Sequence, residues 1–243
     1  MRRALSFLTL LGGPAPPDPS TFVWFPVVGV LVGSAVGGAW RGAGEIWAPP
    51  VAAALALLVD AVLTGGLHLD GLADSGDGLL PAMPTERRLA VMADPRIGAF
   101  GAITLVVVIL ARYAALVVAP ASVWVVAGLW CASRAAVAVV ALTVRYARED
   151  GLASAFLPRP TAAVGSGVTL AVAVAVLGLA IALPLMLTSR AGAGAIAIIA
   201  ELAVIAGITV LAVRRVGGYT GDVLGAQVVL GETAGLLALA ARW

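Results

Sequence analysis

The chain has 243 residues, of which 61% are hydrophobic and only 12% are charged. A soluble domain of average composition carries about 45–50% apolar and about 25% charged residues, so this chain has too little charge to cover a surface in water. The composition excludes a soluble monomer and a disordered chain. The single cysteine excludes a disulfide framework. A net charge of +2 without a basic, aromatic-rich stripe argues against a nucleic-acid partner.

Residues 1–20 predict a segment at the membrane interface. Arg2 and Arg3 precede a short apolar run, which leads into the Gly/Pro-rich stretch 12–17 rather than into a cleavage site. A short apolar segment with two arginines is typical of a helix that lies at the membrane surface.

Seven apolar stretches follow, each long enough to cross about 30 Å of hydrocarbon. They lie at 21–40, 47–67, 98–118, 122–142, 164–187, 194–213 and 223–241. Gln227 and Glu232 interrupt the last one. The prediction is therefore an all-α, polytopic bundle of six to seven transmembrane helices in one integral-membrane domain, residues 1–243. Gly29, Gly33 and Gly37 are spaced four apart, which lets helices approach closely in a bilayer.

The placement of the fifteen arginines predicts the orientation of the bundle. With the N-terminus in the cytoplasm, ten arginines fall in inner segments: Arg2, Arg3, Arg87, Arg88, Arg96, Arg145, Arg148, Arg159, Arg214 and Arg215. Three fall in outer connections: Arg41, Arg190 and Arg242. This asymmetry is what the positive-inside rule favours, so we expect the functional face to be cytoplasmic.

An acidic motif at 64–78 directly follows the second span. Asp70, Asp74 and Asp77 stand at i, i+4 and i+7, so on a helix they share one face over about 10 Å. Like charges on one stripe repel, and Mg²⁺ would relieve the repulsion because it binds one or two carboxylates together with phosphate oxygens. The alternative is a solvated acidic turn. His68, the only histidine, is a candidate substrate donor, acid/base group or interfacial side chain.

Arginines on the second inner segment predict a phosphate clamp. Arg134, Arg145 and Arg148 carry guanidinium groups that match phosphate oxygens, although anchoring at a helix exit would also explain the last two. Arg134 lies inside a span and needs a partner, for which Asp60 and Glu201 are both candidates.

Two further loops carry weaker signals of an anion site. In 214–225 a Gly-rich turn precedes a helix whose first turn would hold Asp222, as part of the site or as a simple cap. In 94–101 the pattern predicts the entry to a helix, with Arg96 as a further phosphate ligand.

The chain resembles the cobalamin synthase (adenosylcobinamide-GDP ribazoletransferase) family over nearly its whole length. The segments that carry the resemblance are 25–29, 64–78, 92–101, 133–134, 145–151 and 217–226. The resemblance implies a multi-pass enzyme of the plasma or inner membrane, a possible homo-oligomer, whose active site faces the cytoplasm. It would join adenosylcobinamide-GDP and α-ribazole, or its 5′-phosphate, with Mg²⁺ and release GMP.

The resemblance also implies roles for the residues above. Asp70, Asp74 and Asp77 would bind metal, with Asp74, Asp222 and His68 as catalytic groups. Arg96, Arg134, Arg145 and Arg148 would bind substrate phosphates. Two other functions stay open on the residues alone: a cation-coupled transporter, for which Asp60 and Glu201 are suitable intramembrane acids, and a related lipid-linked phosphotransferase.

Overall fold

The computed structural model describes residues 1–13, 18–148, 164–189 and 192–242, which are almost entirely helical. Arg159, Arg190 and part of the 145–151 motif, on which sequence predictions depended, lie outside the described residues. The elements are α1 (Arg2–Leu8), the 3-10 helix η1 (Pro19–Trp24), α2 (Phe25–Gly44), α3 (Pro49–Thr64), α4 (Leu67–Leu79), α5 (Thr85–Val91), α6 (Ala99–Val118), α7 (Val123–Thr143), α8 (Val164–Met186), α9 (Ala193–Val216) and α10 (Gly221–Ala240).

Within the described ranges, six helices are long and apolar enough to cross a membrane: α2 with η1, α6, α7, α8, α9 and α10. The pair α3 and α4 also passes the test together, but the two helices meet at 91°. Gly65 and Gly66 make this bend with φ values of 62° and 72°, a left-handed conformation that favours glycine. The predicted bundle of six to seven spans is confirmed, and the second span is broken.

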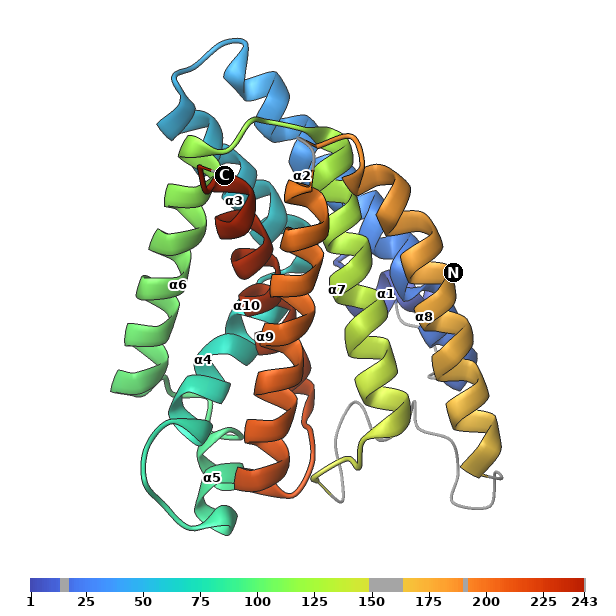
Figure 1. Cartoon of the computed structure of the whole chain (residues 1–243). Helices are drawn as coiled ribbons and strands as arrows, with labels where there is room; N and C mark the ends of the chain where they lie inside the picture. The colour runs from blue at the N-terminus through green and yellow to red at the C-terminus, as the bar shows by residue number, and fades with distance from the viewer. Residues whose placement is uncertain (14–17, 149–163, 190–191, 243) are drawn as a thin grey trace.

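The centre of the bundle is α7, which packs against α2 on one side and α8 on another (Figure 1). The glycines of α2 allow this contact. A Cβ atom on Gly33 would lie 2.8 Å from the Cα of Ala127, and one on Gly37 would lie 2.9 Å from the Cα of Val123. The four-residue spacing seen in the sequence therefore marks close helix packing, as predicted.

Helix α10 is also central, although its sequence gave the weakest span. Gln227 and Glu232 interrupt its hydropathy, yet both are fully buried. The Gln227 amide nitrogen donates to the Thr209 hydroxyl on α9 at 2.7 Å. These polar groups face protein rather than lipid, because a membrane helix satisfies its polar side chains inside the bundle.

The N-terminal helix α1 is folded against α2 and the bend between α3 and α4. The Phe7 ring stacks on the Phe25 ring with centroids 5.8 Å apart. The Leu10 backbone N–H donates to the Leu63 carbonyl at 2.9 Å. Helix α1 is thereby held close to the beginning of α4, the helix that carries the acidic motif.

Candidate active site

The acidic helix α4 packs against the first turns of α10, which brings Asp222 beside the predicted cluster. The contact is close because Gly71 has no side chain. A Cβ atom there would lie 2.7 Å from the Asp222 carbonyl oxygen. Asp74 is half-buried, and the charges of Asp222 and Asp70 both act on its carboxylate. Three carboxylates from two helices therefore face the same region.

Asp77 has different surroundings from the other two motif aspartates. Its side chain accepts hydrogen bonds from the backbone N–H groups of Gly98 at 2.7 Å and Gly101 at 2.9 Å. These groups belong to the first turn of α6, where helix N–H groups have no intrahelical acceptor. The structure thus places Asp77 as a cap for α6, with both oxygens engaged.

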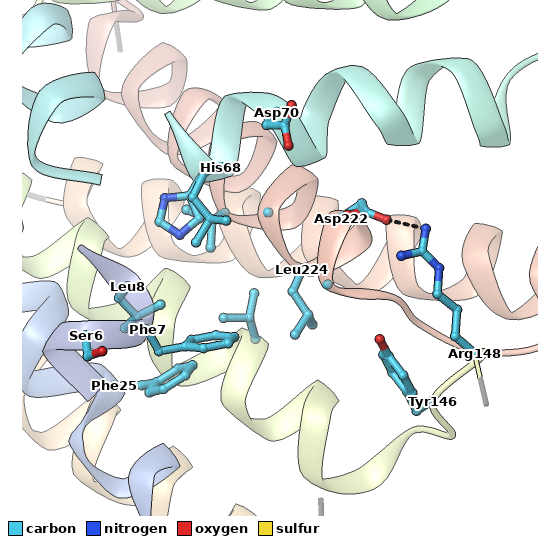
Figure 2. Close-up of a pocket in the computed structure, with 15 residues that line it drawn as sticks. Ser6, Phe7, Leu8, Phe25, His68, Asp70, Tyr146, Arg148, Asp222 and Leu224 are labelled. Carbon is cyan, nitrogen blue, oxygen red and sulfur yellow. Dashed lines mark hydrogen bonds and ion pairs between the residues drawn. The ribbon is translucent and has the colours of Figure 1, made fainter. Parts of the chain in front are cut away.

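Two cavities lie side by side and share four lining residues, Ser6, Phe7, Leu67 and Asp70. The larger, of about 920 Å³, is lined by Asp70, Asp74 and the loop Ala93–Pro95. The smaller, of about 360 Å³, is lined by Asp70, His68, Asp222 and Arg148, together with apolar residues of α1, α2 and α10 (Figure 2). Both volumes fall in the range of about 300–1,000 Å³ that is typical of small-molecule sites. Asp70 is the charged residue that borders both cavities.

A short pairing of two loops holds Arg148 next to Asp222. Tyr146 and Tyr219 form an isolated parallel bridge, and the Tyr219 N–H donates to the Arg145 carbonyl at 2.9 Å. The Arg148 guanidinium then reaches the Asp222 carboxylate at 2.8 Å (Figure 2). The structure places Arg148 beside the acidic site through this ion pair, whereas the Arg145 side chain is exposed.

Arg96 is not among the residues that line the larger cavity, although its neighbours Pro95 and Ile97 are, and it is bound to Asp94. The guanidinium makes a forked contact with that carboxylate at 2.9 and 2.7 Å, and its side chain is 86% exposed. Hydrogen bonds from Arg96 lower the pKa of Asp94 to about 2. The loop therefore keeps this pair ionised at neutral pH, at the edge of the space where a substrate would enter.

Arg134 lies inside the bundle and is not among the residues that line the two cavities. Its guanidinium forms an ion pair with Glu232 of α10. Glu232 also pairs with Arg112 of α6 at 2.6 Å, and Arg112 reaches Asp60 of α3 at 3.1 Å. The partner of Arg134 is therefore Glu232, not Asp60 or Glu201, the two acids that the sequence suggested.

His68 is buried on the wall of the smaller cavity, at the beginning of α4. Figure 2 shows its ring between this helix and the side chains of Leu8 and Phe7. The position fits a contact with a ligand in that cavity. The sequence had left open whether this histidine is a substrate donor, an acid/base group or an interfacial residue.

Sequence reasoning missed the aromatic residues of the site. Phe7, Phe25 and Tyr146 all line the smaller cavity. Phe25 and Tyr146 belong to the motifs at 25–29 and 145–151, to which no aromatic role was assigned, and Phe7 lies in no motif. An isolated aromatic residue in an apolar run is usually a packing residue. Glu232 was visible as an acid inside a span, but its partners on α6 and α7 depend on tertiary packing.

Comparison with known proteins identifies one family. A family model described as Cobalamin-5-phosphate synthase (CobS) matches residues 1–240. A relative from Citrobacter koseri, named adenosylcobinamide-GDP ribazoletransferase, is 38% identical over 89% of this chain and 86% of its own length. Relatives of the same name are 36% identical in Chlorobaculum tepidum, over 99% and 93% of the two chains, and 35% identical in Escherichia coli K12, over 89% and 86%. No solved structure matches significantly.

Proposed function

This chain belongs to the Cobalamin-5-phosphate synthase (CobS) family, and we propose that it joins adenosylcobinamide-GDP to α-ribazole or to its 5′-phosphate. A ribose hydroxyl oxygen of the acceptor would attack the phosphorus that carries the cobinamide. The bond to GMP breaks, the hydroxyl proton is lost, and adenosylcobalamin or its 5′-phosphate forms. The structural observation that supports this assignment is that Asp70 borders two cavities, which would hold one substrate each.

The donor groups of the larger cavity fit Mg²⁺. Asp70 and Asp74 stand one turn apart on α4, and neither has an ion-pair partner among the residues that the structure describes. Those residues contain no ready-made group of three metal ligands. This suits Mg²⁺, which takes one or two carboxylates and completes its shell with water and phosphate oxygens. Asp70 and Asp74 would hold the ion, which when bound neutralises charge on the diphosphate.

The chain's own residues would position the reacting groups. Asp222 faces the smaller cavity, where it would accept a hydrogen bond from the attacking hydroxyl and take its proton. Arg148, paired with Asp222, would bind phosphate oxygens, because its guanidinium keeps further N–H donors for a second anion. Arg96 would meet the nucleotide phosphates next to the larger cavity. In phosphoryl transfer such positioning and charge neutralisation supply most of the catalysis.

Replacing one carboxylate tests the assignment. In purified enzyme, Asp74→Asn should lower the rate of GMP release by at least about 100-fold, because an amide cannot neutralise Mg²⁺. Its matched control is Glu45→Gln, an exposed residue just after α2 and outside both cavities. GMP release by Asp74→Asn near the wild-type rate at saturating Mg²⁺ would refute the metal assignment. Absence of GMP release from the wild-type enzyme would refute the reaction.

We also propose that the site faces the cytoplasm. The hydroxyl of Thr85, in α5, donates to the Arg215 carbonyl at the end of α9 at 3.1 Å. The loop before α6 and the loop before α10 therefore lie on the same side, and both carry arginines that the positive-inside rule assigns to the cytoplasm.

A further inference from the structure

The smaller cavity has two chemically different ends. Phe7 and Phe25 stand at one end, near Leu8, and Figure 2 shows the Phe7 ring pointing from α1 into the cavity. Asp222, Arg148 and Tyr146 stand at the other end. A ligand that fits must therefore be flat and apolar in one part and rich in hydroxyl or phosphate oxygens in the other.

We propose that this cavity is the binding site of the acceptor nucleoside, an inference that rests on the proposed function. The dimethylbenzimidazole base of α-ribazole would lie against Phe7 and Phe25, with its ribose directed toward Asp222 and Arg148. Phe7 and Phe25 already form a stacked pair, 5.8 Å apart with 23° between the ring planes, which offers a flat surface to a third ring. Stacking of a base on an aromatic side chain is a general source of nucleoside affinity.

The polarity of the aromatic end distinguishes this base from guanine. The side chains there are apolar apart from the hydroxyl of Ser6 and the imidazole of His68. Guanine carries several donors and acceptors around its rings, and burying them without partners is costly. The benzimidazole base carries two methyl groups and a single free ring nitrogen, which one donor such as His68 satisfies. The GDP part of the other substrate therefore belongs in the larger cavity.

The arrangement of the two cavities then brings the reacting atoms together. Asp70 lines both, Asp74 lines only the larger, and Asp222 lines only the smaller. An acceptor seated on Phe7 would present its ribose to Asp222 on one side of Asp70. The diphosphate would lie beside Asp74 on the other. The hydroxyl and the phosphorus would thus meet at Asp70.

The test compares two buried phenylalanines that contact each other. Phe25 lines the smaller cavity and not the larger one, whereas Phe22 packs on Phe25 with centroids 5.0 Å apart and lines neither cavity. Phe25→Ala should raise the KM for α-ribazole about tenfold or more, the loss expected for one base-stacking contact. The KM for adenosylcobinamide-GDP should change less than about twofold. Phe22→Ala, which removes a ring of the same size, should leave the ratio of the two KM values unchanged.

A direct measurement of α-ribazole binding tests the acceptor site independently of the proposed reaction. Calorimetric titration of the detergent-purified protein with α-ribazole alone should show binding that Phe25→Ala weakens about tenfold and Phe22→Ala does not. If the wild-type enzyme released no GMP, the proposed reaction would be wrong. The titration would still show whether the smaller cavity binds α-ribazole. Unchanged α-ribazole affinity in Phe25→Ala, or an equal rise of both KM values, would overturn the acceptor site.

Discussion

At the scale of single residues, the three aspartates of α4 have different surroundings although one helix carries them. Asp70 and Asp74 face a cavity and have no ion-pair partner among the described residues, whereas both oxygens of Asp77 accept hydrogen bonds from the first turn of α6. A carboxylate that is already engaged in this way is a poor metal ligand. We therefore interpret Asp77 as the residue that fixes the loop before α6, whose Asp94 and Pro95 line the larger cavity.

This interpretation predicts a specific behaviour for Asp77→Asn. An amide has only one acceptor oxygen and would turn its NH₂ group toward a backbone N–H, so one of the two capping bonds would be lost. The expected cost is about 1–3 kcal/mol, seen as a lower unfolding temperature of the detergent-purified protein. The Mg²⁺ concentration for half-maximal GMP release should stay at the wild-type value. A higher Mg²⁺ requirement with unchanged stability would instead make Asp77 a metal ligand.

The sequence predicts where the three aspartates lie, but not which of them face a cavity and which one caps a helix. The i, i+4, i+7 spacing places all three carboxylates on one helix face, and on that criterion they are equivalent. What separates Asp77 is the position of Gly98 and Gly101, which belong to another helix. The ion-pair partner of Arg134 was also not predictable from the sequence. That partner is Glu232 of α10, whereas the sequence suggested Asp60 and Glu201.

At the scale of helices, one carboxylate connects the helices around the core. Glu232 of α10 pairs with Arg134 of α7 and with Arg112 of α6, and Arg112 also reaches Asp60 of α3. The Trp130 indole N–H donates to Asp60 at 3.0 Å, and the Arg112 guanidinium lies 4.7 Å from the centre of the Trp130 ring. Charged groups in a membrane interior persist when they are paired in this way.

Removing that carboxylate should destabilise the bundle strongly. Glu232→Gln leaves Arg134 without its acid and Arg112 with one acid fewer, and breaking a buried ion pair costs about 3–5 kcal/mol. Glu201→Gln is the comparison variant, because Glu201 is equally buried and its charge also acts on Arg134 and Arg112, but neither of its oxygens has a hydrogen-bond partner among the described residues. Thermal unfolding in detergent should show a large loss for the first variant and a clearly smaller one for the second. Equal losses would contradict the role of Glu232.

The ends of the helices were predictable to within a few residues, because hydropathy and length decide which segments cross a membrane. The bend between α3 and α4 was not predicted, and 47–67 was expected to be one span. Hydropathy averages over a window and is insensitive to the backbone angles of Gly65 and Gly66. The adjacent glycines were the only local signal of the break, and the 91° angle depends on how α4 packs against α10 and α6.

At the scale of the whole molecule, the number of crossings determines where each connection lies. Helix α5 contacts the end of α9 through Thr85 and Arg215, so the connections before α6 and before α10 share one face (Figure 1). If the pair α3 and α4 counts as one span, the chain crosses seven times and this face is the cytoplasmic one. If the pair only dips into the membrane, α5 with Arg87 and Arg88 would lie outside, against the positive-inside rule.

Reporter fusions distinguish the two arrangements. With the N-terminus inside and seven crossings, alkaline phosphatase fused after the C-terminal residue should be active and a fluorescent protein at the same place dark. The same reporters fused after Pro84, in the connection before α5, should give the opposite pattern and serve as the internal control. A cytoplasmic C-terminus would mean that α3 and α4 form a re-entrant pair. Because Asp70 and Asp74 lie on α4, that result would also move the metal site to the outer face, away from its nucleotide substrate.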